Sequence, residues 1–363
     1  MRTVVISAGG TGGHISPGIA LAETFIEFKD HFECESVIIH SVKRNLNNPD
    51  LQNPPCLVVW HDSPRLSKWN FLIFPILFTK NLLITFFQFR KLKVDVVISM
   101  GGYSGLPALI YAIVFRKNIF LCEQNCVMGR VNKLFKNFAK KVALSFPLSD
   151  TTELQNNFKI IGNPIRKKVI PSISIKVNRE ISAKKKEKLN VLVMGGSQGS
   201  RQINNMVIRA MENDEVAQKI NFRMLTGTSL YEETKKKNTK QLDLISYSID
   251  MKEHYEWANL VVARSGAGVL SECAVFAIPM ILIPYPYAAD NHQEMNAKYF
   301  ESNGAAFIIN SESEDETELV KLLLSMSSNL EILNEASKMS LSLSRINASY
   351  DTLNFFLKEK HES

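Results

Sequence analysis

The sequence predicts an α/β protein of two domains, each built around a parallel β-sheet. The chain has 363 residues, which is enough for two domains of ordinary size. Short β-branched apolar runs alternate with segments of helical periodicity, a pattern typical of β-α-β units with helices on both faces of a sheet. A strand, a glycine-rich loop and a helix open the chain, and the same series starts again near residue 190. The two halves therefore share one design.

The first half begins with a predicted strand at Thr3–Ser7, which leads into the glycine loop Gly9–Gly13 and then into a helix over Pro17–Phe28. A later strand, Val94–Ser99, ends in a second glycine loop, Gly101–Gly105. The other strands predicted in this half are Ser36–His40, Leu57–Trp60, Asn118–Cys122 and Lys141–Ser145. Loops at the carboxyl ends of such strands are where open parallel sheets hold their ligands.

The second half repeats this start. Residues 171–190 are polar, rich in lysine and without periodicity, so they are predicted to be a linker or an exposed loop. The strand Val191–Met194 then leads into the glycine loop Gly195–Ser200 and a helix with an apolar face. Further strands are predicted at Phe222–Leu225, Leu260–Ala263 and Met280–Ile283.

The composition is that of a globular protein. Hydrophobic residues make up 45% of the chain and charged residues 22%, which excludes collagen, coiled coil and disorder as the main architecture. The five cysteines are scattered and form no C-x-x-C pair, so neither a zinc site nor a disulfide framework is expected, and a reducing cytoplasmic setting is predicted. The amino-terminal sequence lacks the long apolar stretch of a signal peptide, so we expect no targeting segment.

Charge and apolar surface indicate an anionic partner. The formal net charge is +7, and the excess of basic residues lies in the first half. The segment Trp69–Phe89 is apolar enough to suggest a membrane span, but Pro75 and the central Lys80 and Asn81 argue against one. An amphipathic surface that enters one leaflet and a buried hairpin of core helices are both compatible with this segment.

The three glycine loops favour phosphate binding. Glycine lets the backbone approach a phosphate closely, and the amino terminus of the next helix presents free N–H groups. No GxxxxGK[ST] motif is present, and the first loop lacks the GxGxxG spacing, so binding of a dinucleotide is the second choice. His14 follows the first loop, where a histidine can serve as a general base or can cap the helix through a hydrogen bond to the backbone.

Seven motifs occur in an order that is specific when taken together. They are GGTGGHISP (Gly9–Pro17), GGYSGLP (Gly101–Pro107), EQN with a later glycine and NKL (Glu123–Leu134), GNPIR (Gly162–Arg166), GGSQGS (Gly195–Ser200), RSGAGVLSE (Arg264–Glu272) and DNHQEMNA (Asp290–Ala297). Over nearly the whole chain they resemble the MurG family of bacterial glycosyltransferases.

The resemblance implies two Rossmann-like domains that face each other across a cleft, as in GT-B type glycosyltransferases. It implies an acceptor and membrane-associating domain over 1–164, a domain that binds UDP-N-acetylglucosamine over 165–345, and a terminal helix over 346–363 that crosses back to the first domain. The implied reaction is inverting, metal-independent transfer of N-acetylglucosamine to the 4-hydroxyl of N-acetylmuramic acid in lipid I. Its product, lipid II, serves peptidoglycan synthesis and thereby cell shape and division.

The resemblance also implies site residues. His14 and Glu123 are both candidates for the general base, and the sequence leaves the choice open. Tyr103 and Asn132 are implied for the acceptor. The residues implied for the donor are Thr11, Gly12, Gly13, Asn125, Arg166, Ser197, Gln198, Gly199, Ala267, Gly268, Val269, Leu270, Ser271, Glu272 and Gln293.

The chemistry of these residue types fits the implied reaction. Backbone N–H groups, a helix dipole and Arg166 can balance the charge of a leaving diphosphate, and Glu272 can accept hydrogen bonds from ribose hydroxyls. No DxD-type carboxylate pair lies in a convincing loop, so no metal and no cofactor are expected. Two positions depart from the family pattern, since Gly268 sits in the donor-site turn and His292 precedes Gln293.

The partners implied are UDP-N-acetylglucosamine, lipid I and the anionic inner leaflet of the bacterial plasma membrane, contacted through the apolar and basic segment 65–93. Cell-wall synthesis proteins are further candidates, and the implied location is peripheral, on the cytoplasmic face. No nucleic acid is expected, because the chain has no helix-turn-helix or RNA-binding aromatic pattern.

Three alternatives stay open from the sequence. A nicotinamide-dependent dehydrogenase would use one glycine loop for its dinucleotide. A non-enzymatic protein that adheres to membranes or nucleic acid would account for the charge but not for the three loops. Another two-domain glycosyltransferase could act on a glycolipid acceptor such as diacylglycerol, and only acceptor chemistry separates it from the family above.

Overall fold

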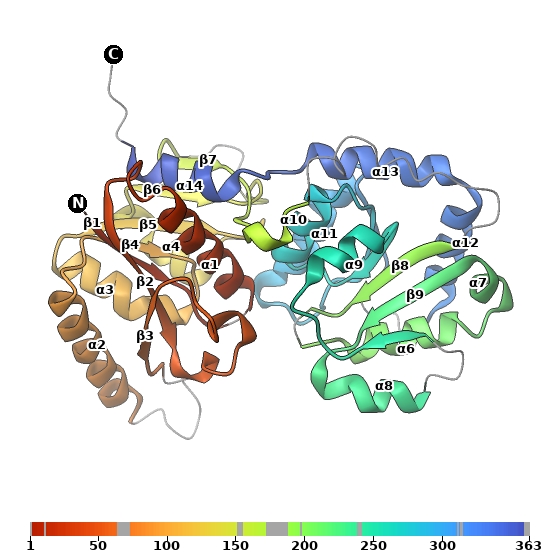
Figure 1. Ribbon diagram of the computed structural model, residues 1–363, viewed down its shortest axis with the longest axis horizontal. Helices are drawn as coiled ribbons and strands as arrows, with labels where there is room; N and C mark the ends of the chain where they lie inside the picture. The colour runs from red at the N-terminus through yellow and green to blue at the C-terminus, as the bar shows by residue number, and fades with distance from the viewer. Residues whose placement is uncertain are drawn as a thin grey trace, which may run out of the picture. The chain divides into compact units, whose positions relative to one another are not determined.

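The computed structural model describes residues 2–10, 12–63, 73–150, 155–171, 188–196, 198–237, 242–310, 312 and 315–358. It divides the chain into two compact units. Unit 1 combines Met1–Lys167 with Asn347–Ser363, and unit 2 is Lys168–Ile346. The chain passes from unit 1 to unit 2, and later back to unit 1, close to the boundaries expected after residues 164 and 345. Each unit holds one parallel sheet with helices packed on it (Figure 1).

Unit 1 contains a seven-stranded sheet in the order β3-β2-β1-β4-β5-β6-β7, with every neighbouring pair parallel. Its strands are β1 (Arg2–Ser7), β2 (Cys34–Val42), β3 (Leu57–His61), β4 (Val96–Ser99), β5 (Asn118–Glu123), β6 (Lys141–Leu144) and β7 (Phe158–Ile160). Its α-helices are α1 (Gly12–Glu27), α2 (Phe74–Lys91), α3 (Leu106–Val114), α4 (Arg130–Phe135) and α14 (Ala348–Leu357). Short 3-10 helices are η1 (Lys43–Asn45), η2 (Pro49–Leu51), η3 (Tyr103–Gly105) and η4 (Lys136–Phe138).

Unit 2 contains a six-stranded sheet in the order β10-β9-β8-β11-β12-β13, again with parallel pairs. Its strands are β8 (Leu189–Met194), β9 (Ile220–Leu225), β10 (Asp243–Ile245), β11 (Leu260–Ala263), β12 (Met280–Leu282) and β13 (Ala306–Ile308). Its α-helices are α6 (Arg201–Ala210), α7 (Asp214–Lys219), α8 (Tyr231–Lys237), α9 (Met251–Trp257), α10 (Ala267–Val275), α11 (His292–Ser302), α12 (Thr317–Ser328) and α13 (Leu330–Ser342). The 3-10 helices are η6 (Thr228–Leu230) and η7 (Ala289–Asn291), while η5 (Lys167–Val169) lies at the boundary of the units.

Both sheets have a switch point where the strand order reverses. In unit 1, β1 lies between β2 and β4, and in unit 2, β8 lies between β9 and β11. Open α/β sheets bind ligands beside the carboxyl ends of the strands at such points. The loops at Gly9–Gly13 and Gly101–Gly105 follow β1 and β4, and the loop at Gly195–Ser200 follows β8. The structure therefore places all three predicted loops at switch points.

Every strand predicted from an apolar run is present, with ends shifted by at most two residues. The short strands β7, β10 and β13 were not predicted. The predicted start of the first helix is wrong, because α1 begins at Gly12 and not at Pro17. Glycine lowers helix propensity, but the first turn of a helix has free N–H groups and tolerates residues that would break its interior. His14 consequently lies in the first turn of α1.

The carboxyl-terminal helix belongs to unit 1. The ring of Phe356 in α14 stacks on Phe120 of β5, with centroids 4.7 Å apart and planes 10° apart. Lys141 of β6 donates to the carbonyl oxygens of Phe355 and Lys358 at 2.6 and 3.1 Å. The end of the chain is thus held by both apolar packing and hydrogen bonds.

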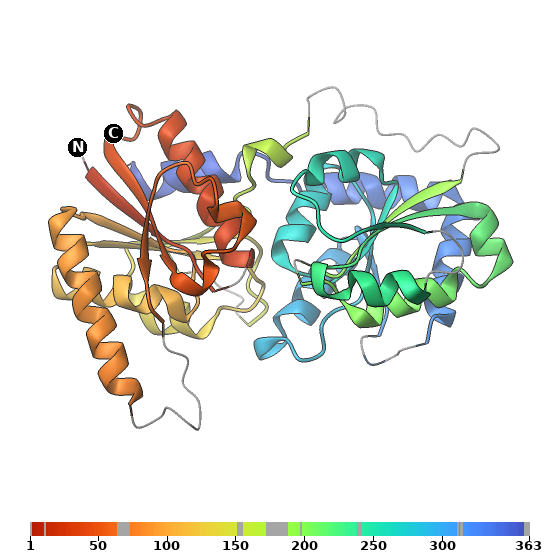
Figure 2. The same ribbon diagram turned by 60° about the horizontal axis from the view of Figure 1, so that its bottom comes forward.

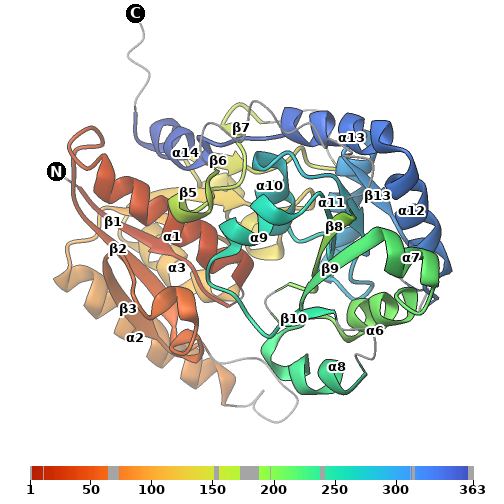
Figure 3. The ribbon, with the colours of Figure 1, turned by 45° about the vertical axis from the view of Figure 1, so that its right-hand side comes forward.

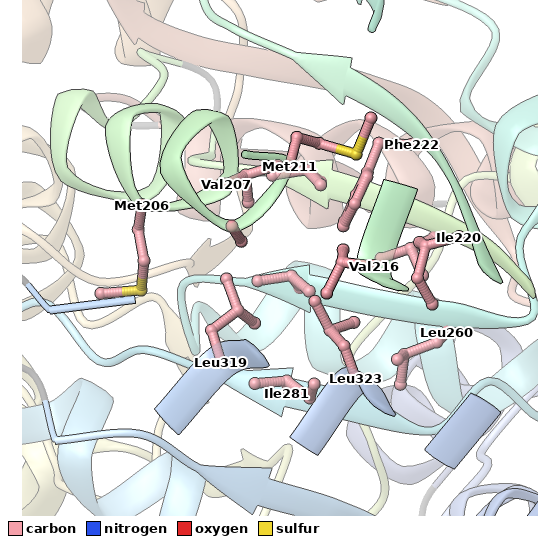
Figure 4. Close-up of a cluster of buried hydrophobic side chains, with 14 of the residues drawn as sticks. Met206, Val207, Met211, Val216, Ile220, Phe222, Leu260, Ile281, Leu319 and Leu323 are labelled. Carbon is pink, nitrogen blue, oxygen red and sulfur yellow. The ribbon is translucent and has the colours of Figure 1, made fainter. Parts of the chain in front are cut away.

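The core of unit 2 forms where helices meet the sheet (Figure 4). Met206 and Val207 of α6 and Phe222 of β9 are buried in the same cluster as Leu319 and Leu323 of α12. Burial of each such side chain contributes about 1.5–3 kcal/mol, so this cluster fixes the sheet against its helices and holds the loops at its carboxyl edge in place.

Helix α2 buries two polar residues and exposes several large apolar ones. Its buried residues are Asn81, Thr85 and Phe89, while the large apolar residues exposed along it are Ile76, Leu77, Leu83, Ile84 and Phe87. Figure 2 shows this helix, in orange, along the outside of unit 1. The alternative of a buried hairpin of core helices does not fit α2, and residues 69–72 of that segment lie outside the described residues. Within the described parts of the chain, no helix is both long and apolar enough to cross a bilayer.

Two buried histidines lie beneath α2. His40 of β2 stacks on His61 of β3, with centroids 4.0 Å apart and planes 9° apart. Asn81 Nδ2 lies 3.3 Å from His61 Nδ1, and Ser7 Oγ lies 3.3 Å from His40 Nδ1. Burial lowers the pKa of His61 to about 4 and lowers the pKa of His40 well below its usual value. Both rings are therefore neutral at physiological pH.

We predict that acid destabilises the protein through these rings. The folded state protonates His61 only near pH 4, whereas the unfolded chain does so near 6.5, so this stability is present above pH 6.5 and is lost as the pH falls toward 4. The variant His61→Gln should flatten the dependence by up to about 1.4 kcal/mol per pH unit in that window. Urea unfolding at neutral and acidic pH measures this, and equal slopes for the variant and the native chain would contradict it.

Candidate functional site

The candidate site of unit 1 forms around Gly101 and Gly102, which follow β4. Both have positive φ, 91° and 74°, which favours glycine. A Cβ at Gly102 would lie 3.1 Å from His14 Cε1, and one at Gly101 would lie 3.5 Å from Asn132 Nδ2. The two glycines therefore make room for a histidine from α1 and an amide from α4. The structure brings together His14 and Asn132, which the sequence separates by more than 100 residues.

Glu123 organises the loop between β5 and α4. Its Oε1 accepts hydrogen bonds from the backbone N–H of Asn125 at 3.1 Å and from Asn125 Nδ2 at 3.4 Å. Its Oε2 accepts from the N–H of Gly129 at 2.9 Å and from Asn132 Nδ2 at 2.8 Å. Burial raises the pKa of Glu123, although these donors favour the ionised form. With 3% of its surface exposed, the carboxylate is built into the loop, while the half-buried His14 can reach a ligand.

The structure describes three of the other residues implied for unit 1. Gly12 and Gly13 form the first turn of α1, and Tyr103, 67% exposed, begins η3. Thr11 lies outside the described residues. The structure thus places Gly12, Gly13 and Tyr103 on the two loops of this switch point, and their contacts with a ligand stay predictions.

Arg166 is paired within unit 1. Its Nη2 donates to Glu23 Oε1 of α1 at 2.9 Å, and its Nη1 donates to Asp50 Oδ1 of η2. The side chain is only 11% exposed. Two carboxylates therefore already balance the guanidinium that the sequence suggested for a leaving diphosphate, and Arg166 fastens the GNPIR segment to α1 and η2.

In unit 2 the glycine loop after β8 lies against the end of β9. Gly199 has φ +75°, and a Cβ there would collide with the carbonyl oxygen of Thr226. Gly227, with φ +84°, leaves equally little room beside the carbonyl group of Gln198. The N–H of Gly199 donates to the oxygen of Gly196 at 2.9 Å. That N–H is used within the loop, and a contact of Gly199 with the donor stays a prediction.

Two helices begin at this switch point with different caps. Ser200 caps α6, since its Oγ accepts from the N–H of Ile203 at 3.4 Å and also from Arg264 Nη2 at 3.0 Å. Gly266 precedes α10 and provides no side-chain cap, and a Cβ at Gly266 or Gly268 would meet nothing within 4 Å. There is therefore room beside the start of α10, and the amino terminus of a helix suits an anion.

A cavity of about 170 Å³ lies beside these loops within unit 2. Its lining is mostly apolar and comes from the ends of β8 and β9, the segment before α9, α9 itself and α10, including Met194, Leu225 and Val269. Glu272 and Tyr255 also line it, and the Tyr255 hydroxyl donates to Glu272 Oε2 at 2.6 Å. Figure 3 shows α9 and α10 side by side, which is how the two side chains meet.

The remaining residues implied for the donor on α10 differ in how far they are exposed to solvent. Gly268 and Val269 reach the surface, while Ala267, Leu270 and Ser271 are buried. The N–H of Leu270 already donates to the oxygen of Gly266 at 3.1 Å, so Leu270 takes a structural place in α10.

Gln293 and Gln198 complete the implied donor set. Gln293 accepts from the N–H of Tyr285 through Oε1 at 3.0 Å, which leaves its NH2 group to offer a ligand. Gln198 is exposed, and Ser197 lies outside the described residues.

Sequence reasoning missed two side chains that hold this site. Arg264 donates from Nη1 to the carbonyl oxygens of Ile283 and Pro284, and from Nη2 to Ser200 and Gln202, so it joins the loops after β8, β11 and β12. Tyr255 holds Glu272. Arg264 lies in the RSGAGVLSE motif and could have been singled out, whereas nothing near Tyr255 in the sequence marks it.

Comparisons with known proteins define the class. Residues 4–144 match the glycosyltransferase family 28 N-terminal domain, and residues 190–352 match the glycosyltransferase family 28 C-terminal domain. The structure of MurG from Acinetobacter baumannii has the same fold, with a TM-score of 0.78 over 99% of this chain and 100% of that one, at 23% identity. The protein is therefore a glycosyltransferase of the two-domain GT-B type, and the dehydrogenase and non-enzymatic alternatives are set aside.

The names of individual relatives specify the kind of transferase more closely. A protein of Leptospira interrogans named UDP-N-acetylglucosamine--N-acetylmuramyl-(pentapeptide) pyrophosphoryl-undecaprenol N-acetylglucosamine transferase is 54% identical over 98% of this chain and 99% of its own length. A protein of the same name from Carboxydothermus hydrogenoformans is 32% identical over 84% of each chain. The chain belongs to this family of N-acetylglucosamine transferases.

We predict that alanine substitutions at two glycines of the loop after β8 destabilise the protein to different degrees, because the space around the two glycines differs. Gly199→Ala should lower the free energy of unfolding by about 2–5 kcal/mol, because left-handed backbone costs about 1–2 kcal/mol without glycine and overpacking adds about 1–3 kcal/mol. Gly196→Ala is the matched control, since Gly196 also has positive φ but has nothing within 4 Å of a Cβ, so only the backbone cost applies. Urea unfolding compares them, and equal losses would refute the crowding at Thr226.

Proposed function

We propose that the protein transfers N-acetylglucosamine from UDP-N-acetylglucosamine to the 4-hydroxyl of N-acetylmuramic acid in lipid I, with inversion and without a metal, to form lipid II. The 54% identity with the Leptospira interrogans transferase over nearly the full chain carries this proposal. In it, unit 2 binds the donor and unit 1 the acceptor.

The cavity of unit 2 supports the donor assignment. Its apolar walls suit the flat face of a uracil ring, and Glu272 at its edge offers a carboxylate oxygen to a ribose diol. The uncapped N–H groups of α10 are available to the diphosphate, and the NH2 group of Gln293 to the sugar. The base, ribose and diphosphate of one nucleotide thus find partners of matching chemistry in a single unit.

The reaction needs a base at the acceptor hydroxyl. We assign this role to His14, because both oxygens of Glu123 are engaged by backbone and amide donors. His14 takes the proton of the 4-hydroxyl as that oxygen bonds to the anomeric carbon. The bond from this carbon to the diphosphate oxygen breaks, and UDP leaves with its charge balanced by α10. One in-line displacement of this kind inverts the anomeric configuration.

We further propose that the protein lies on the cytoplasmic face of the plasma membrane, where its acceptor is anchored. The apolar residues that α2 exposes, together with its buried polar residues, support contact with a lipid layer. Of the segment 65–93 suggested for this contact, residues 65–72 lie outside the described residues. Cell-wall synthesis proteins stay candidate partners.

The transfer assay uses labelled UDP-N-acetylglucosamine and a lipid I analogue in the presence of EDTA. The native protein should give labelled lipid II, and His14→Ala should lower kcat by about 10²–10⁴-fold, since it removes the base. The affinity for UDP-N-acetylglucosamine should be unchanged in this variant.

Two results would go against these assignments. Loss of UDP-N-acetylglucosamine binding in His14→Ala would show that His14 holds the donor and is not the base. Failure of the native protein to label lipid I, with label passing to a diacylglycerol acceptor, would favour the other glycolipid transferase class.

A double-mutant cycle tests whether Glu272 binds the donor and whether Tyr255 holds Glu272 in position. Glu272→Ala should weaken UDP-N-acetylglucosamine binding by roughly 10–100-fold, as expected when hydrogen bonds to a charged group are lost. Tyr255→Phe should weaken binding less, and it should have no further effect in the Glu272→Ala background, because the hydroxyl that this variant lacks is the group that holds the carboxylate. Tyr299→Phe on α11 is the control. Additive losses measured by calorimetry would contradict this link.

A further inference from the structure

A pair of tyrosines lies on the loop between β12 and α11 in unit 2. Tyr287 is 83% exposed, and its ring stands edge-on to the ring of Tyr285, with centroids 5.7 Å apart and planes 73° apart. The guanidinium of Arg264 lies over the Tyr285 ring, 5.4 Å from its centroid. Because hydrogen bonds to four partners fix Arg264, the Tyr287 ring is supported from beneath and still open to a ligand.

The backbone of this loop is fixed as well. The N–H of Ala288 donates to the carbonyl oxygen of Tyr285 at 3.1 Å, and the N–H of Asn291 donates to that of Ala288 at 3.0 Å. Asp290 and Asn291 both have a φ of 53°, in the left-handed region. Two such residues in succession strain the chain, and strain of this kind is concentrated at functional sites. The loop therefore has the properties of a preformed binding surface.

The same loop holds the amide that we assign to the donor sugar. The N–H of Tyr285 donates to Gln293 Oε1 at 3.0 Å, so the Gln293 amide lies beside the backbone that carries the two rings. Residues 285–289 read YPYAA and contain no charged side chain. Such a segment suits the uncharged sugar of the donor better than its diphosphate.

We propose that Tyr287 packs against the N-acetyl group of the donor sugar and makes the site prefer N-acetylglucosamine to glucose. The inference rests on the proposed function and adds a specificity-determining residue to it. The acetamido methyl is the group that distinguishes the two sugars and is also the most apolar part of the larger one, so an exposed aromatic ring gains most by covering it. Gln293 does not separate the sugars, because hydroxyls of either one can accept from its NH2 group.

Calorimetric titration with UDP, UDP-glucose and UDP-N-acetylglucosamine tests this assignment. Tyr287→Ala should weaken binding of UDP-N-acetylglucosamine by about 3–10-fold, as expected for the loss of one aromatic contact, and should change binding of UDP and UDP-glucose by less than about twofold. Tyr287→Phe keeps the ring and should keep the preference. Tyr247→Ala is the matched control, because Tyr247 lines the cavity beside Glu272, and its loss should weaken all three ligands alike.

Several outcomes would overturn the proposal. Equal weakening of UDP-glucose and UDP-N-acetylglucosamine in Tyr287→Ala would show that the ring does not select the acetamido group. Unchanged binding of all three ligands would remove Tyr287 from the donor site, and a higher KM for the lipid I analogue would then assign the ring to the acceptor. These results leave the proposed transferase function intact, whereas a native protein that binds none of the three ligands would overturn that function as well.

Discussion

Close packing against glycines at the two switch points, by backbone in unit 2 and by a histidine ring in unit 1, is the constraint on which the sites depend. At Gly199 the chain passes so near the carbonyl group of Thr226 that no side chain fits, and at Gly102 the ring of His14 occupies the space that a side chain would need. These contacts fix the loops after β4 and β8 at the carboxyl edges of their sheets. The backbone N–H groups and the histidine ring at these loops are therefore held in place before a ligand binds. Little conformational entropy is then lost on binding.

Buried polar contacts hold the side chains around these loops. Glu123 gathers the segment before α4 through four hydrogen bonds, and Arg264 joins the loops after β8, β11 and β12. Tyr255 fixes one oxygen of Glu272, whose side chain lines the cavity of unit 2. In each case a residue buried or half-buried in the fold orients a group that faces the site, so the geometry does not depend on ligand binding to assemble it.

The sequence predicted the strands, the two α/β units and the glycine loops, because apolar runs and glycine clusters are local signals. It did not predict that α1 begins at Gly12, since glycine and proline obscure helical periodicity there. Nor could it predict the pairing of Arg166 with Glu23 and Asp50, which lie 143 and 116 residues away in the chain. Nor could it predict that α2 buries Asn81 and Thr85 while several large apolar residues are exposed, because an apolar run does not reveal which of its sides is covered.

Calorimetric titration with UDP-N-acetylglucosamine in the presence of EDTA tests the central claim most directly, with UDP-glucose and NADH as controls. We predict that one donor binds per chain, through unit 2, with UDP-glucose weaker and NADH without effect. Binding of NADH, or no binding of any UDP-sugar, would contradict the assignment of the cavity beside Glu272 to a nucleotide-sugar donor.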